Sequence, residues 1–143
     1  MIGFFEYQYL KFKKNHLRNL VALAKADGIV HEEEVKFLYK VGEKYGLKER
    51  QIKTIVESDK TFEPFIPNGH EQKVGMLYDI VGMMLADQKI EPSEMEFCEN
   101  MFRKFNYKSD LIKRMIKLYK KEVKDNEEWE GFLEEAKFYM LTA

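Results

Sequence analysis

The sequence predicts an all-α protein, a helical bundle of about seven helices. Apolar residues recur at intervals of three and four through most of the 143 residues, as in helices that pack on one face. Residues 17–56 also align without a gap to residues 77–116, and ten of the forty aligned positions are identical. No stretch alternates with the period of two that a half-buried strand shows. We therefore expect two pseudo-symmetric three-helix repeats, spanning about residues 15–58 and 69–125.

The N-terminal segment, residues 4–14, is aromatic and basic, and we expect a short helix there. Leu10 and Phe12 would pack on the body, and a membrane-surface or partner helix is the alternative. The next helix begins at Asn15 or His16, or continues from the first without a break. Its apolar face consists of Leu17, Leu20, Val21, Leu23 and Ala24.

A tight turn is predicted after this helix, because Gly28 suits the left-handed residue that commonly ends a helix. His31 stands at the expected N-cap of the second helix, and Glu34 lies three residues later, where a glutamate can bond back to the N-cap N–H. Gly46 is expected to end the second helix, and residues 48–58 form a short third one. The buried stripe of the second helix contains Val35, Leu38, Val41 and Tyr45.

The second half follows an interruption at residues 59–68, which hold two of the three prolines. Proline is poorly tolerated inside helices, so we expect an ordered loop here. A fourth helix should span about residues 69–87, and a fifth should begin at Pro92, a residue suited to the first helical position. The sixth and seventh helices are predicted at residues 108–125 and 127–141.

Composition excludes several classes of protein. The chain has 24 basic and 25 acidic residues, so its charge does not favour nucleic acid as a partner. Its longest apolar runs are far short of a transmembrane span, and the N-terminus lacks the order of a signal peptide. The single cysteine, Cys98, forms no internal disulfide, and its place on an apolar stripe indicates a core residue. We expect a cytoplasmic protein with one domain over residues 1–143.

The acidic turn occurs twice, as AKADGIVHEEE at residues 24–34 and MLADQKIEPSE at residues 84–94. Asp27 and Asp87 each stand at the C-terminal end of a helix, where the macrodipole disfavours a carboxylate by about 0.3–1 kcal/mol. Two compensations are compatible with the sequence. Each aspartate accepts hydrogen bonds from the next helix, which is the commoner arrangement, or coordinates a cation with Glu34 or Glu94.

The candidate metal ligands are Asp27, Glu34, Asp87 and Glu94, with Glu33 and His31 as neighbouring support. Their hard oxygen atoms favour Mg²⁺, Ca²⁺ or Mn²⁺ over zinc, although the turn is much shorter than a twelve-residue calcium loop. The cofactor itself is left open. No nucleophile and base pair, phosphate-binding loop or GxSxG motif is discernible, so we assign no catalytic residue and expect no enzyme.

The runs AKADGIVHEEE and LYDIVGMMLADQKIEPSE resemble the TerB-like family of tellurite-resistance proteins, whose members typically show an Ala-Asp-Gly turn and then acidic residues once per half. The resemblance covers residues 15–120, and Gln88 departs from it by replacing the second glycine. It implies an all-helical fold, acidic residues clustered between the halves that bind a metal ion, and a role in tellurite or stress response. The alternative is a metal-free module that binds another protein, for example through the lysines of the sixth helix.

Overall fold

A computed structural model describes residues 2–26, 28, 30–60, 63–86, 89–123 and 125–141, with side chains from residue 10 onward. In these ranges the chain is helical, with an isolated antiparallel bridge between Tyr107 and Met140 as the strand-like pairing. The all-α prediction is confirmed, and so is the number of about seven helices. The helices are α1 (Ile2–Ala24), α2 (Glu32–Lys44), α3 (Glu49–Val56), α4 (His70–Met84), α5 (Pro92–Lys104), α6 (Leu111–Lys121), α7 (Asn126–Ala136) and the 3₁₀ helix η1 (Lys137–Tyr139).

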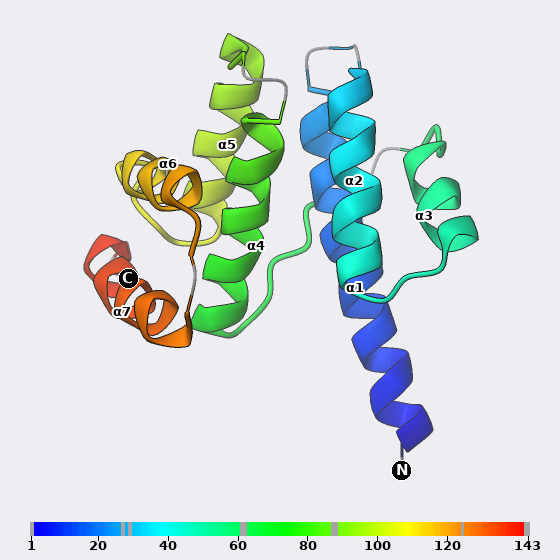
Figure 1. The fold of residues 1–143 in the computed structure, drawn as a ribbon, viewed down its shortest axis with the longest axis horizontal. Coiled ribbons are helices and arrows are strands. Elements are labelled where there is room, and N and C mark those ends of the chain that lie inside the picture. The colour runs from blue at the N-terminus through cyan, green and yellow to red at the C-terminus, as the bar shows by residue number, and fades with distance from the viewer. Residues whose placement is uncertain are drawn as a thin grey trace.

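Helix α4 is the centre of the molecule, because it packs on α1, α2, α5, α6 and α7. In Figure 1 the α1–α2 hairpin stands beside the α4–α5 hairpin, with α3 outside the first and α6 and α7 outside the second. The end of α1 and the start of α2 lie toward the top of this view, and so do the end of α4 and the start of α5. The first turns of α2 and α5 therefore lie at one end of the bundle.

Helix α1 is one continuous helix of 23 residues, so of the two alternatives left open at Asn15 and His16 the uninterrupted helix is the one observed. No proline or glycine interrupts the chain from Phe4 to Ala24, and the apolar period continues across the expected break. Leu10 and Phe12 pack against the core, as predicted. The ring of Phe12 meets Phe65 edge to face at 5.7 Å, which ties α1 to the segment between α3 and α4.

The predicted caps are largely confirmed. Gly28 and Gly46 have φ values of +84° and +80°, the left-handed conformation that favours glycine. His31 is the N-cap of α2, and its N–H donates to Glu34 Oε1 at 2.9 Å. Pro92 is the first residue of α5. Gly46 and Pro92 thus stand just after the end of α2 and at the start of α5, and Gly28 lies between α1 and α2.

The later helices are shorter than predicted. Helix α4 ends at Met84 rather than residue 87, and α6 starts at Leu111 rather than residue 108. The residues before α6 bond to the C-terminal segment: Lys108 N–H donates to the Tyr139 carbonyl at 2.7 Å, and Leu141 N–H donates to Asn106 at 2.8 Å. These long-range bonds hold residues 106–108 outside α6. Helix α6 stops before Glu122, which has φ +64°, and α7 gives way to η1 after Ala136.

The core contains the predicted apolar face of α1 and, from the predicted stripe of α2, Leu38 and Val41 with Tyr45 packed against them, whereas Val35 is half-buried outside the core. Met83 and Met84 are fully buried, so they fill the core. Cys98 is also fully buried, and burial raises the pKa of its thiol to about 12. Because the thiolate is the reactive form, this cysteine is a packing residue, as predicted. Among the described residues, no helix is long and apolar enough to cross a membrane.

Gly82 of α4 lies against side chains of both α2 and α6. A Cβ there would lie 2.6 Å from Tyr119 Cε2 and 2.8 Å from Phe37 Cζ, whereas a Cβ at Gly75 in the same helix would meet nothing within 4 Å. We expect Gly82→Ala to destabilise the protein by about 1–2 kcal/mol, because overpacking outweighs the gain in helix propensity. Gly75→Ala should stabilise it by up to about 1 kcal/mol. Urea unfolding measures both, and a Gly82→Ala variant as stable as Gly75→Ala would contradict this packing.

Candidate functional site

The predicted ligands fall into two groups. Asp27 and Asp87 lie outside the described residues. Glu34 and Glu94 are at the third position of α2 and α5, and their exposed fractions are 0% and 1%. Glutamate is almost never fully buried unless its charge is compensated, so both positions are exceptional.

Glu34 shows how its carboxylate is held. Its Oε1 accepts the N–H of His31 at 2.9 Å, whereas its Oε2 is buried and has no hydrogen-bond partner among the described residues. An ionised carboxylate in such a place costs several kcal/mol unless a cation or further donors compensate it. The environment of Oε2 therefore calls for a cation, an additional donor or a proton.

The two supporting residues are placed differently. Glu33 is exposed and pairs with Lys36 at 3.2 Å, so its charge is directed to solvent rather than toward Glu34. This pairing raises the pKa of Lys36 through the hydrogen bond and the attraction of Glu33, then of Glu32. His31 is half-buried at the N-cap. In the described part of the chain, no group of three or more His, Cys, Asp and Glu side chains is placed to hold a metal ion.

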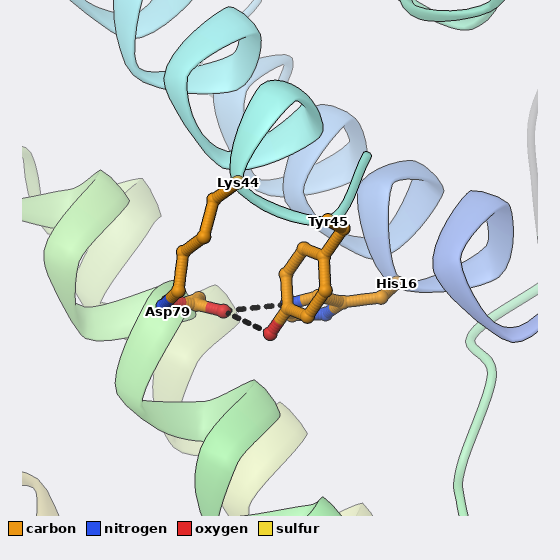
Figure 2. A network of polar contacts seen from close by, with 4 residues as sticks. All are labelled: His16, Lys44, Tyr45 and Asp79. Carbon is orange, nitrogen blue, oxygen red and sulfur yellow. Dashed lines mark hydrogen bonds and ion pairs between the residues drawn. The ribbon is translucent and has the colours of Figure 1, made fainter. Parts of the chain in front are cut away.

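A second polar centre, which sequence reasoning missed, joins α1, α2 and α4. Figure 2 shows His16 from α1, Lys44 and Tyr45 from α2 and its C-cap, and Asp79 from α4 converging on one point. His16 Nε2 lies 2.8 Å from Asp79 Oδ2, and the Tyr45 hydroxyl donates to the same oxygen at 2.9 Å. Lys44 Nζ lies 3.9 Å from the other oxygen, Oδ1. His16 is fully buried and Asp79 is 5% exposed, so α4 offers one shared acceptor to two neighbouring elements.

The sequence contains a signal for this centre. Asp79 is the one charged residue between Val74 and Ala86, in a helix whose other residues are mostly apolar. An acidic residue in such a run must be paired, because an unpaired buried charge is costly. His16 lies four residues before Leu20, on the buried face of α1, where an imidazole also needs a partner. Periodicity cannot show that these two residues meet, because they are 63 positions apart.

A cavity of about 440 Å³ opens beside Asp79. Its walls come from α2, α4, the α6–α7 connection and the first turn of α7, and they include two half-buried aromatic rings, Tyr78 and Trp129, whose centroids are 5.4 Å apart. The remaining lining residues are Lys44, Tyr45, Gly75, Val123, Asp125 and Asn126. The site thus combines a buried carboxylate, an exposed ammonium and an aromatic wall.

Burial is the main influence on the two tyrosines of this region. Burial raises the pKa of Tyr78, and the neighbouring Tyr119 and the charge of Asp79 raise it further. Tyr119, whose ring centroid lies 5.1 Å from that of Tyr78, also has a raised pKa through burial and then through Asp79. Both phenols therefore stay protonated at neutral pH, and Asp79 is the acceptor around which the cleft is built.

No protein-family model matches the chain, and neither a curated protein nor a solved structure matches it. The fold and the two polar centres are therefore interpreted from this chain's own residues. The resemblance to the TerB-like family rests on the two acidic-turn motifs alone.

Proposed function

We propose that this chain is a non-catalytic, TerB-like protein of the tellurite or stress response, in which the acidic turn before α2 holds a divalent cation. The observation that carries the proposal is the buried carboxylate of Glu34, whose Oε2 has no hydrogen-bond partner among the described residues. Asp27 precedes it by seven positions, and its carboxylate would supply a second hard oxygen ligand. Mg²⁺, Ca²⁺ and Mn²⁺ are the ions to test, and the cytoplasm is the proposed compartment.

We also propose that the two hairpins are pseudo-symmetric repeats, so that Asp87 and Glu94 form a second, weaker ion site. The helix bounds support this, because α1 and α4 end sixty positions apart, at Ala24 and Met84. Helices α2 and α5 likewise begin and end sixty positions apart. The second turn has Gln88 where the first has Gly28, and we expect it to bind the ion less tightly.

The ion should stabilise the folded protein. A ligand that binds only the native state adds RT ln(1 + [L]/Kd), or about 1.4 kcal/mol at a concentration of about ten times Kd. We expect thermal unfolding of metal-free protein to shift upward with at least one of Mg²⁺, Ca²⁺ and Mn²⁺ at millimolar concentration. Glu34→Gln and Asp27→Asn should remove most of that shift, and Glu94→Gln should remove less.

Glu33→Gln is the matched control, since it changes an exposed neighbour and should leave the ion-dependent shift intact. Melting curves of wild type that ignore all three ions would overturn the cation site and leave the aspartates as structural hydrogen-bond acceptors. The role in cells is tested by expressing wild type and Glu34→Gln in a tellurite-sensitive bacterium. We expect wild type, but not Glu34→Gln, to improve growth on tellurite. Equal growth with the two proteins would show that any protection does not depend on the ion site.

The second candidate function is a metal-free module that binds an acidic protein through α6. Its support is a row of exposed lysines at helical spacing, Lys113, Lys117 and Lys120. Lys121 also belongs to this helix, but it pairs with Glu128 at 3.1 Å and so helps to hold α7. Partners that are retained by the Asp27→Asn, Asp87→Asn double variant and lost when the three exposed lysines become glutamine would favour this module.

A further inference from the structure

Asp79 lines the cavity, and one of its two carboxylate oxygens, Oδ1, is paired only with the exposed Lys44 among the described residues. The buried His16 Nε2 and the half-buried Tyr45 hydroxyl both reach Oδ2. Oδ1 has Lys44 Nζ at 3.9 Å, beyond hydrogen-bond distance, and 64% of the Lys44 side chain is exposed. Because the ammonium is exposed to water and lies beyond hydrogen-bond distance, the pairing of Oδ1 with Lys44 is easily exchanged.

A comparable position elsewhere in the chain shows what a satisfied site looks like. Asn19 stands sixty residues before Asp79 in the gapless alignment, and it is also buried. Its Nδ2 donates to the Phe65 carbonyl at 2.8 Å, and its Oδ1 accepts the Phe65 N–H at 3.0 Å. A carboxylate cannot make this pair of bonds, because it has no donor for a carbonyl oxygen. At position 79 the residue is an aspartate, and a cavity lies beside its carboxylate instead of a peptide backbone that bonds to it.

The walls of the cavity match an organic cation. Tyr78 and Trp129 present aromatic rings, and a cation is attracted to the face of such rings. Lys44 Nζ already lies 5.6 Å from the Tyr45 ring centroid, so an ammonium group is accommodated at this rim. The other charged lining residue is Asp125, which makes the lining negative overall, with two carboxylates and one ammonium.

We propose that the Asp79 cavity binds a small primary alkylammonium ion, which places its ammonium on Asp79 Oδ1 in place of Lys44 and its aliphatic chain against the edge-to-face pair of Tyr78 and Trp129. The ligand donates a charge-assisted hydrogen bond to an oxygen that the fold leaves open, and its apolar stem covers the aromatic wall. Lys44 is the internal competitor for this position. The site is separate from the acidic turn before α2, and its occupancy does not depend on a divalent cation.

Trp129 provides a direct readout, because it is the only tryptophan in the chain and it lines the cavity. We would titrate the full chain with n-butylammonium chloride and follow tryptophan fluorescence at constant ionic strength. Butan-1-ol and sodium butyrate have the same stem without the positive charge. We expect a saturable change with butylammonium, and no saturable change with either control.

Three variants separate charge, competition and space. Asp79→Asn keeps an amide oxygen for His16 and Tyr45 but turns a donor toward the cavity, so affinity should fall by at least about tenfold. Lys44→Met removes the competitor and should raise affinity by about twofold to fivefold. Gly75→Leu should fill the cavity and abolish binding, because a Cβ at Gly75 meets nothing within 4 Å and the helix should tolerate it.

Glu34→Gln should bind butylammonium as wild type does, so failure of the cation site and failure of this site are distinguishable. Circular dichroism and urea unfolding confirm that each variant is folded. Equal binding by wild type and Asp79→Asn would overturn the proposal, as would the same response to butan-1-ol. Absence of a saturable response in both wild type and Lys44→Met would overturn it as well.

Discussion

Asp79→Ala should lower the free energy of unfolding by about 4 kcal/mol. The substitution removes the acceptor shared by His16 Nε2 and the Tyr45 hydroxyl, and it leaves a fully buried imidazole without its charged partner. Breaking a buried pair in this way costs about 3–5 kcal/mol, since the remaining group loses its compensation. Urea unfolding followed by circular dichroism measures the change.

Two milder substitutions of the same network serve as its controls. Tyr45→Phe removes one donor and keeps the carboxylate on His16, so a loss of about 1 kcal/mol is expected. Asp79→Asn retains an oxygen in the Oδ2 position and should cost less than Asp79→Ala. If Asp79→Ala were within about 1 kcal/mol of wild type, the network would not hold α1, α2 and α4 together in the way the distances indicate.

How far the fold could be predicted depends on whether the signal is local. Gly28, Gly46 and Pro92 restrict or free the backbone only within their own turn. Each lies in a turn or at a helix start where the sequence predicts one. The start of α6 depends instead on the bonds of Lys108 and Asn106 to the C-terminal segment, 31 and 35 positions away along the chain. No local pattern contains that information, so the prediction extended the helix by three residues.

The same distinction applies to the polar centres. Repetition of the acidic turn drew attention to Glu34 and Glu94, and both prove to be buried. The repeat does not point to Asp79 and His16, because each is a single residue in an apolar stripe and their contact joins different helices. Their meeting follows from the packing of α1 on α4, which a repeat suggests but does not specify. A charged residue inside an otherwise apolar helix is the signal that predicts such a centre.

Asn19→Ala is expected to cost about 3 kcal/mol, the second largest effect. Asn19 is 3% exposed, and its side chain makes two hydrogen bonds to the backbone of Phe65, at 2.8 and 3.0 Å. These bonds tie α1 to the connection between α3 and α4. Alanine would leave the N–H and the carbonyl of the half-buried Phe65 without these partners, and each lost bond costs about 0.5–1.5 kcal/mol, so the two together approach about 3 kcal/mol. Urea unfolding again provides the measurement.

Asn19→Asp places at this position the residue found sixty positions later, and it should make stability depend on pH. The ionised carboxylate can accept the Phe65 N–H, but its second oxygen would face the Phe65 carbonyl, where Asn19 Nδ2 now donates. Protonation supplies a donor for that carbonyl, so folding favours the protonated form and raises the pKa of the new carboxyl above its ordinary value of about 3.9. The deficit relative to wild type should then be smallest below about pH 4 and grow as pH rises through the folded-state pKa. Urea unfolding of both proteins from pH 3.5 to 8 tests this, and a deficit independent of pH would show that the second oxygen does not face the carbonyl.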